Sequence, residues 1–178
     1  CAFYFPGLRA RELSMSLFVV ATPIGNAADF SLRALEILKT ADLIIGEEMK
    51  VLRQTLKAAG VNGKSLEQLN EHSDARDLEH FTAECKTKTV ALVSDCGTPG
   101  FCDPGADLVK ACVAKGIEVR PVPGPSSLMT LLSVCGERVD RFLFYGFLPA
   151  KNEERAQAIQ ELKKEKRAFI VMETPYRA

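Results

Sequence analysis

Short apolar runs alternate with amphipathic stretches along most of the chain. The runs are rich in β-branched and aromatic residues, and they predict buried strands over residues 17–21, 42–45, 89–93, 117–121, 141–147 and 168–173. The stretches between them repeat apolar residues at helical spacing, and they predict helices over residues 29–40, 48–59, 74–86, 104–115, 126–135 and 152–164. Strands that alternate with helices indicate an α/β fold with a mostly parallel sheet covered by helices on both faces.

Local signals mark several of the predicted helix ends. Gly60, Gly116 and Gly136 each follow a predicted helix, at the position where glycine commonly ends one. Asp103 and Pro104 predict a helix start, with Asp103 as the N-cap and Pro104 at the first helical position.

A polar, turn-like stretch at residues 136–140 interrupts the alternation. We therefore expect an N-terminal α/β domain over residues 15–138, followed at residues 139–178 by the incomplete start of a second α/β domain. One strand-helix-strand unit is too small to enclose a core of its own. Residues 1–14 are expected to be a disordered or upstream extension, because Met15 directly precedes the first strand.

The composition narrows the classes of partner and site. The 178 residues include 23 basic and 23 acidic ones, so nucleic acid would have to bind through a local patch. The six cysteines form no C-x-x-C pair and are interpreted as free thiols, with Cys112 and Cys135 on apolar helix faces. His72 and His80 have no partners at zinc-ligand spacing, so no metal site is expected. No apolar run reaches the length of a membrane span, no signal-peptide layout is present, and a cytoplasmic location is expected.

The loop at residues 94–105, S-D-C-G-T-P-G-F-C-D-P-G, is the strongest candidate for ligand binding. It joins a predicted buried strand to a predicted helix, which is where open α/β sheets bind ligands. Its small residues let backbone groups approach a ligand closely. A purely structural turn is the alternative, and the acidic Asp95 within the loop favours ligand binding.

Three further segments lie at predicted strand ends or helix starts: A-T-P-I-G-N (21–26), G-E-E-M-K (46–50) and P-G-P-S-S (123–127). A fourth, N-E-H-S-D (70–74), lies in a predicted loop. The serines of P-G-P-S-S can equally cap a helix. The chain contains no G-x-G-x-x-G and no G-x-x-x-x-G-K, so neither a dinucleotide fingerprint nor a P-loop is indicated.

Taken together and in order from Leu17 to Arg177, these segments resemble the tetrapyrrole-methylase-like (class III) S-adenosyl-L-methionine (SAM) methyltransferases. Within that family the chain is most similar to the enzymes that methylate a cytidine ribose 2′-hydroxyl in small-subunit ribosomal RNA. The resemblance implies SAM as the cofactor, ribosomal RNA in the small ribosomal subunit as the substrate, a homodimer, and no membrane association.

The resemblance also implies cofactor-binding residues in three loops. They are Pro23, Ile24, Gly25 and Asn26 in the first, Ser94, Asp95, Cys96, Gly97 and Thr98 in the second, and Ser126 and Ser127 in the third. The segment Glu173–Arg177 matches a second-domain E-S-P-H-R motif, with threonine and tyrosine replacing serine and histidine. The run 47–50 departs from the family's acid-Asp-Thr-Arg pattern, and Cys96 replaces an alanine.

Methyl transfer from a sulfonium to a ribose hydroxyl needs alignment of the reacting atoms and a group that assists a poor nucleophile. Asp95, Glu47, Glu48 and His72 are the available groups, and we expect Glu47 and His72 to be the catalytic residues on the substrate side. Glu48 can instead favour a helix N-terminus electrostatically. His72 can instead be an ordinary surface residue.

Two other functions stay open. A tetrapyrrole (precorrin-type) C-methyltransferase would keep the fold and the cofactor, although the S-D-x-G-T-P-G loop in place of a G-D-P loop argues against it. A non-catalytic RNA- or nucleotide-binding module would fit the incomplete second domain. The basic run at residues 163–167 is interpreted as a solvated helix end in preference to an RNA-facing patch.

Overall fold

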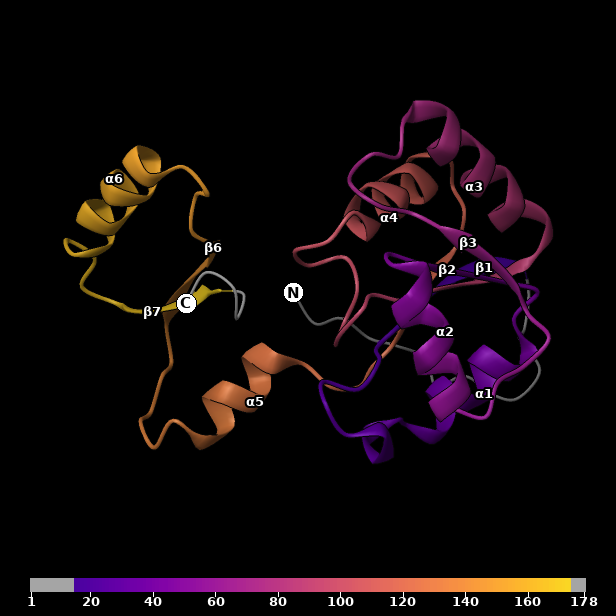
Figure 1. Cartoon of the computed structure of the whole chain (residues 1–178), viewed down its shortest axis with the longest axis horizontal. Helices are drawn as coiled ribbons and strands as arrows, with labels where there is room; N and C mark the ends of the chain where they lie inside the picture. The colour runs from indigo at the N-terminus through magenta and orange to yellow at the C-terminus, as the bar shows by residue number, and fades with distance from the viewer. Residues whose placement is uncertain (1–14, 174–178) are drawn as a thin grey trace. The chain divides into compact units, whose positions relative to one another are not determined.

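The computed structural model describes residues 15–173, drawn in colour in Figure 1. The predicted extension at residues 1–14 and the motif residues Thr174–Arg177 lie outside this range. The described chain forms two compact units, the first ending at Ser127 and the second beginning at Leu128. The boundary expected after residue 138 stays a prediction.

The first unit is built on a five-stranded sheet in which every pair of neighbouring strands is parallel. The strands are β1 (Ser16–Val20), β2 (Leu43–Gly46), β3 (Ser65–Gln68), β4 (Thr89–Leu92) and β5 (Val119–Val122). Their order across the sheet is β3-β2-β4-β1-β5. The predicted α/β class and the parallel sheet are therefore confirmed.

Strand β3 was not predicted from the sequence. Its four residues, S-L-E-Q, contain one apolar side chain and none is fully buried. It lies at the edge of the sheet and pairs only with β2, so it has neither the length nor the apolar content of the central strands. Its presence matters because it carries the loop that contains His72 to the edge of the sheet where the other strands end.

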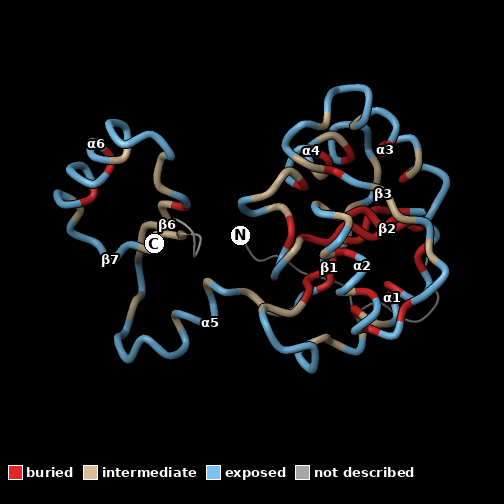
Figure 2. Tube along the Cα trace, in the orientation of Figure 1, coloured by how far each residue is buried: buried red, intermediate tan, exposed pale blue. Residues whose placement is uncertain are grey.

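Helices pack against both faces of this sheet. The 3₁₀ turn η1 (Ala27–Asp29), α1 (Leu32–Thr40) and α2 (Met49–Ala58) follow the first two strands, while α3 (Ala75–Thr87) and α4 (Gly105–Ala114) follow the next two. Successive strand residues point to opposite faces, so Phe18 packs with Leu38 of α1, and Leu17 packs with Leu108 of α4. Figure 2 shows the buried residues concentrated in the sheet and in the inward faces of the helices.

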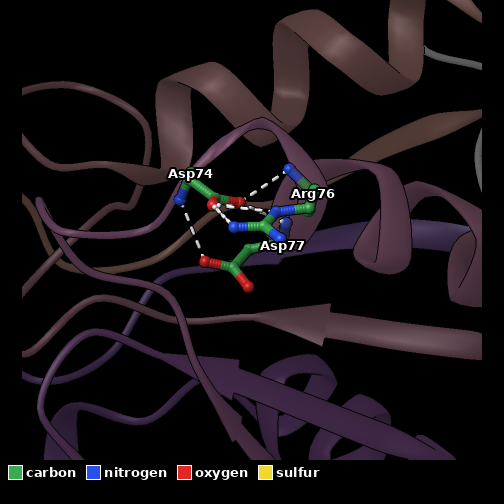
Figure 3. A network of polar contacts seen from close by, with 3 residues as sticks. All are labelled: Asp74, Arg76 and Asp77. Atoms are coloured by element: carbon green, nitrogen blue, oxygen red, sulfur yellow. Dashed lines mark hydrogen bonds and ion pairs between the residues drawn. The ribbon is translucent and has the colours of Figure 1, made fainter.

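Side-chain caps fix where the helices begin. Ser31 Oγ accepts a hydrogen bond from Ala34 N at 3.0 Å, so α1 begins later than predicted, after the separate turn η1. Asp74 forms a capping box with Asp77 at the start of α3 (Figure 3). Hydrogen bonds from the backbone N–H groups of Asp77 and Arg76 lower the pKa of the Asp74 carboxyl.

The predicted start of α4 was wrong by one residue. Pro104 is the N-cap and the helix begins at Gly105, without a side-chain cap bond from the N-cap residue. The cause is Asp103, whose carboxylate accepts hydrogen bonds from Gly100 N and Gly105 N, all at 2.9 Å. Asp103 therefore fastens the preceding loop to the helix start from just outside the helix.

The second unit contains α5 (Ser127–Val134), whose first residue still belongs to the first unit, then β6 (Phe142–Phe147), α6 (Asn152–Leu162) and β7 (Ala168–Met172). Strands β6 and β7 pair in parallel, with an irregularity in register between Phe144 and Gly146. This is the strand-helix-strand unit expected from the sequence. Within residues 15–173, no helix has the length and apolar character needed to cross a membrane.

The cysteines differ in their surroundings more than the sequence suggested. Cys112 is buried, as expected, beside Cys85 of α3, and their mutual hydrogen bond together with burial raises the pKa of the Cys85 thiol. Cys135 was expected on an apolar helix face, but it lies beyond the end of α5 and is exposed. Its thiol donates to Leu132 O, which ends the helix locally instead of contributing to a core. No group of three His, Cys, Asp or Glu side chains suited to a metal ion occurs in the described part of the chain.

Two leucines of α1 provide a test of this packing. Leu38 is 0% exposed and Leu32 is 86% exposed. We expect Leu38→Ala to lower the free energy of unfolding by about 2–5 kcal/mol, because it opens a cavity against the sheet. Leu32→Ala should change it by less than about 0.5 kcal/mol. Urea denaturation of both variants measures the difference, and equal losses would contradict the observed packing of α1.

Candidate functional site

The carboxyl ends of all five parallel strands lie at one edge of the first unit's sheet. Each of the five loops at this edge contains one of the segments that the sequence singled out, including the loop after β3, which contains residues 70–74. Helices α1 and α4 come after the adjacent strands β1 and β4, yet they pack on opposite faces. Such a reversal is the place where open α/β sheets bind ligands, so the loops after β1 and β4 form the centre of the candidate site.

Thr22 joins the loop after β1 to the loop after β4. Its backbone N–H donates to Gly97 O at 2.8 Å, and its hydroxyl donates toward Ser94 O at 3.3 Å and Gly97 O at 3.4 Å. The side chain is fully buried, so these carbonyls supply the partners that a buried hydroxyl needs. Thr22 lies in the singled-out segment at residues 21–26 but was not among the predicted site residues. A threonine at the end of a buried strand run was the available signal.

Gly97 lies where three loops meet. Its φ of +83° is in the region that favours glycine. A Cβ added there would stand 3.3 Å from Ile24 Cγ2 and 3.7 Å from Pro125 O. The neighbouring Thr98 hydroxyl donates to the same Pro125 carbonyl at 3.0 Å. The structure therefore brings Ile24, Gly97 and Thr98, all predicted site residues, against the loop after β5.

The loop after β2 approaches from the other side. Glu48 N donates to Asp95 Oδ1 at 3.1 Å, which ties the start of α2 to the β4 loop. Glu48 also caps α2 through a hydrogen bond from Lys50 N, so the capping role that the sequence left open for it is present. The backbone carbonyl of Glu47 accepts a hydrogen bond from Gln68 Nε2 at 2.9 Å. Strands β2, β3 and β4 are thus linked at the same edge.

Carboxylates crowd this edge. Burial raises the pKa of Glu47, and the charges of Asp95, Asp103 and Glu71 raise it further. Burial also raises the pKa of Asp95, the Glu48 N–H opposes that rise, and the Glu48 carboxylate adds to it. The edge therefore disfavours further negative charge and favours a cationic group.

Asp103 and Glu71 belong to this site although the sequence analysis did not propose either of them for it. Asp103 holds both ends of the 100–105 segment through its carboxylate, and its charge reaches Glu47. Glu71 lies on the loop after β3. It adjoins the predicted residue His72, but without β3 the sequence did not place this loop at the carboxyl edge of the sheet.

Other predicted residues lie further from the junction. Gly25 and Asn26 are exposed, and the Asn26 side chain is engaged as the cap of η1, accepting from Ala28 N at 3.0 Å. Cys96 is exposed beside Asp95, which together with partial desolvation raises the pKa of the Cys96 thiol. Ser127 is exposed at the start of α5, and Ser126 is half-buried.

His72 is placed at the correct edge but at its periphery. It follows the edge strand β3, and its backbone N–H donates to Asn70 Oδ1 at 2.9 Å. The imidazole is 84% exposed, and its Nε2 lies 3.8 Å from Glu71 Oε1, itself on an exposed side chain. The structure thus contrasts a half-buried Glu47 with a solvent-exposed His72.

Residues 16–178 match the family model of the tetrapyrrole (corrin/porphyrin) methylases. The chain belongs to this family. It is 41% identical over 162 residues to the ribosomal RNA small subunit methyltransferase I of Escherichia coli O157:H7, and 44% identical over 163 residues to the protein of the same name from Xylella fastidiosa. These alignments cover 90% and 91% of this chain but 56% and 59% of the relatives, so the chain spans little more than half their length.

Solved structures agree on the fold. A diphthine synthase superposes with a TM-score of 0.60 over 89% of this chain and 64% of its own length, at 16% identity. A uroporphyrin III C-methyl transferase from Thermus thermophilus superposes with a TM-score of 0.53 over 74% of this chain and 58% of its own, at 20% identity. At such low identity the likeness supports the α/β architecture alone.

The contact between the loops after β1 and β5 can be tested by a reciprocal substitution. A Cβ added at Gly124 would stand 2.9 Å from Ala21 Cβ. We expect Gly124→Ala to lower the free energy of unfolding by about 1–3 kcal/mol. Adding Ala21→Gly should restore part of that loss, because it removes the clashing atom. Denaturation of both single variants and the double variant gives the coupling energy, and strictly additive effects would contradict the contact.

The crowding around Glu47 predicts a pH-dependent effect on stability. Because its pKa is raised in the folded state, folding favours the protonated carboxyl over the ionised one. The stability that protonation gives is fully present below the unfolded pKa of about 4.3 and is lost as pH rises through the raised value. Glu47→Gln cannot ionise, so it should raise the melting temperature at pH 7 by about 1–3 °C and change it little near pH 4. Glu36→Gln, at an exposed position on α1, serves as the control. Thermal scans between pH 4 and pH 7 measure the difference in melting temperature between Glu47→Gln and the unmodified chain. A difference that grows toward low pH would contradict a raised pKa of Glu47.

Proposed function

We propose that this chain carries part of the SAM site of a ribosomal RNA methyltransferase, which methylates a cytidine ribose 2′-hydroxyl in the small ribosomal subunit. The observation that carries the proposal is the junction at Gly97, where the loops after β1, β4 and β5 meet at the reversal point of the sheet. The relatives named as small-subunit ribosomal RNA methyltransferases share about 40% identity over 90% of this chain, which supports the same activity.

The residues at the junction suit such a cofactor. SAM, when bound, supplies a methyl group on a positively charged sulfur. Burial chiefly raises the pKa values of Glu47 and Asp95, and neighbouring carboxylates raise them further, so a sulfonium placed here would favour their ionised forms. The proposed cofactor-binding residues are Pro23, Ile24, Gly25, Asn26, Ser94, Asp95, Cys96, Gly97, Thr98, Ser126 and Ser127.

Within this set, Asp95 has the most defined position. The Glu48 N–H fixes its carboxylate at the start of α2, and the Thr22 hydrogen bonds fix the loop on either side of it. A charged group held in this way keeps its place before a ligand arrives, so little ordering is needed on binding. Asp95 is therefore the residue we assign to cofactor binding through charge.

Glu47 is the residue we assign to the acceptor. Its half-buried carboxyl has a raised pKa, which makes it a better proton acceptor than an ordinary exposed glutamate. We propose that Glu47 assists the ribose hydroxyl and that His72, on the neighbouring loop, acts on the substrate side. A ribosomal substrate implies work in the cytoplasm, and the homodimer implied by the family resemblance is part of this proposal.

Two measurements test the cofactor and acceptor assignments. Calorimetric titration of SAM into the chain should give saturable binding, and Asp95→Ala should weaken it about tenfold or more. Glu47→Gln should leave the SAM dissociation constant within about twofold while methyl transfer to unmethylated small subunits falls about 100-fold. Glu36→Gln should change neither quantity. An Asp95→Ala chain that binds SAM normally would contradict the cofactor assignment.

The acceptor distinguishes the rival functions. Labelled methyl groups should enter ribosomal RNA at a position that resists alkaline cleavage, because that cleavage needs a free 2′-hydroxyl. Transfer to a porphyrinoid carbon would support the tetrapyrrole alternative. SAM-independent RNA retention with no transfer to any acceptor would support the non-catalytic module.

A further inference from the structure

Helix α2 presents three basic side chains on its solvent side. Lys50, Arg53 and Lys57 are separated by three and then four residues, so they lie along one face of the helix. All three are exposed, while Leu52 and Leu56 of the same helix are buried against the sheet. We call these three residues the α2 basic strip.

Within residues 15–173, no carboxylate forms an ion pair with the α2 basic strip, and the nearest acid along the chain is the N-cap Glu48. The helix contains no acidic residue, and none of the ion pairs in the described range involves Lys50, Arg53 or Lys57. Some other cations of the described range are paired, as in Arg76 with Asp74 at 3.2 Å and Arg120 with Glu118 at 2.7 Å. Lys86 and Lys110 are not paired within that range, so the distinguishing feature of the strip is that three unpaired cations share one helix face. The strip is therefore a local positive surface in a chain whose total charge is balanced.

Helix stability explains only the last of these cations, because Lys57 lies in the last turn of α2, where the helix dipole favours positive charge. Like charges three or four residues apart repel one another, and a cation in the first turn opposes the helix dipole. Lys50 is the second residue of α2 and so has both disadvantages. Charges that destabilise their own helix and have no compensating contact within the fold are expected where a binding partner provides that contact.

The two helical layers of the first unit differ in charge. Helices α1 and α2 together carry five basic residues and one acidic residue, whereas α3 and α4 carry three basic and four acidic residues. Counted over their helical residues, α1 and α2 carry a net positive charge, whereas α3 and α4 carry a net negative one. The two layers lie on opposite faces of the sheet, as Figure 1 shows.

The α2 basic strip begins beside the candidate site. Glu48, the N-cap of α2, donates its N–H to Asp95, and Lys50 is two residues further along. From Lys50 to Lys57 the helix advances about 10 Å away from the carboxyl edge. A polyanion that lies along this face therefore reaches the loop edge where Glu47 stands.

We propose that the α2 basic strip binds the phosphate backbone of the RNA substrate next to the nucleotide that enters the site. This inference rests on the proposed RNA substrate and names the surface that receives it. Lysine and arginine side chains hold phosphates without reading sequence, so the strip positions the RNA and does not select it. Apart from Ala58, the exposed α2 side chains are polar, and no large apolar side chain of this helix is exposed, which favours a nucleic acid over insertion into a lipid surface.

The basic run at residues 163–167 is a weaker candidate. Arg167 Nη2 is bound to Glu165 Oε2 at 2.6 Å, so the arginine is already neutralised. Glu153, Glu154 and Glu161 lie on the helix that precedes the run. The same comparison that favours α2 therefore disfavours this segment.

A pair of matched double variants tests the strip. Arg53→Gln/Lys57→Gln removes two charges from α2, and Lys86→Gln/Lys110→Gln removes two from α3 and α4. Each chain is titrated against a fluorescein-labelled RNA hairpin by anisotropy between about 50 and 200 mM salt. We expect the α2 variant to bind about tenfold more weakly and its log–log salt slope to fall by about 1.5, because two phosphate contacts are lost. The control variant should keep the salt slope of the unmodified chain. The charge-conserving variant Arg53→Lys/Lys57→Arg should keep it as well, because both positive charges remain.

Three results would overturn the strip: unchanged RNA binding by the α2 variant, an equal loss in the control variant, or tighter binding of the unmodified chain to phosphatidylserine vesicles than to the RNA. Calorimetric titration of SAM into the same chains separates this inference from the proposed function. Normal SAM binding with unchanged RNA binding by the α2 variant refutes the strip alone. Absent SAM binding, with RNA binding lost only in the α2 variant, refutes the donor assignment and supports the strip.

Discussion

The candidate site depends on the buried hydrogen bonds that Thr22 makes to the loop after β4. A parallel sheet brings strand ends to one edge, but it does not fix the loops that leave them in different directions. Thr22 does so with its backbone N–H and its hydroxyl, both directed at carbonyls of the 94–97 segment. Because the residue is fully buried, water cannot reach it, and breaking these hydrogen bonds would leave buried polar groups unsatisfied. The loop geometry is thereby set before any ligand binds.

This constraint explains the small residues around it. Once the loop after β4 is held against the end of β1, Gly97 has side chains and carbonyls from two other loops within 4 Å. Gly124 is similarly close to Ala21. The space that larger side chains would occupy is taken by the neighbouring loops themselves. Glycine and proline in these motifs therefore serve the close approach of backbone to backbone, and their role as turn formers follows from it.

The sequence predicted the central architecture well because that architecture rests on local patterns. Buried runs such as 17–21 and 89–93 determined the strands, and the glycines at 60 and 116 marked the helix ends. Strand β3 escaped because an edge strand needs little apolar sequence and owes its existence to pairing with β2. The helix start at Gly105 differed because Asp103 accepts hydrogen bonds from both Gly100 N and Gly105 N, so it binds the loop as well as the helix start and lies one residue before the N-cap.

The site was predictable only where one motif contained it. Asp95 and Gly97 lie within a recognisable loop, so their placement followed from the strand before them. The charged neighbours of Glu47 come from two other loops, and their effect on its pKa arises only when the sheet order brings Asp95 and Glu71 near it. Pairwise charge in a folded site depends on distance and burial, and neither is written in a linear sequence.

Opposite charges lie next to one another in the first unit and relate the candidate site to the α2 basic strip. The loop edge concentrates carboxylates, whereas α2, which begins at that edge, exposes three unpaired cations. A nucleic acid backbone is repelled by the first and attracted by the second, so it is guided along α2 and not into the carboxylate cluster. A cationic cofactor experiences the opposite preference. Adjacent surfaces of opposite sign can therefore sort a positive donor from a negative acceptor although the chain as a whole carries no net charge.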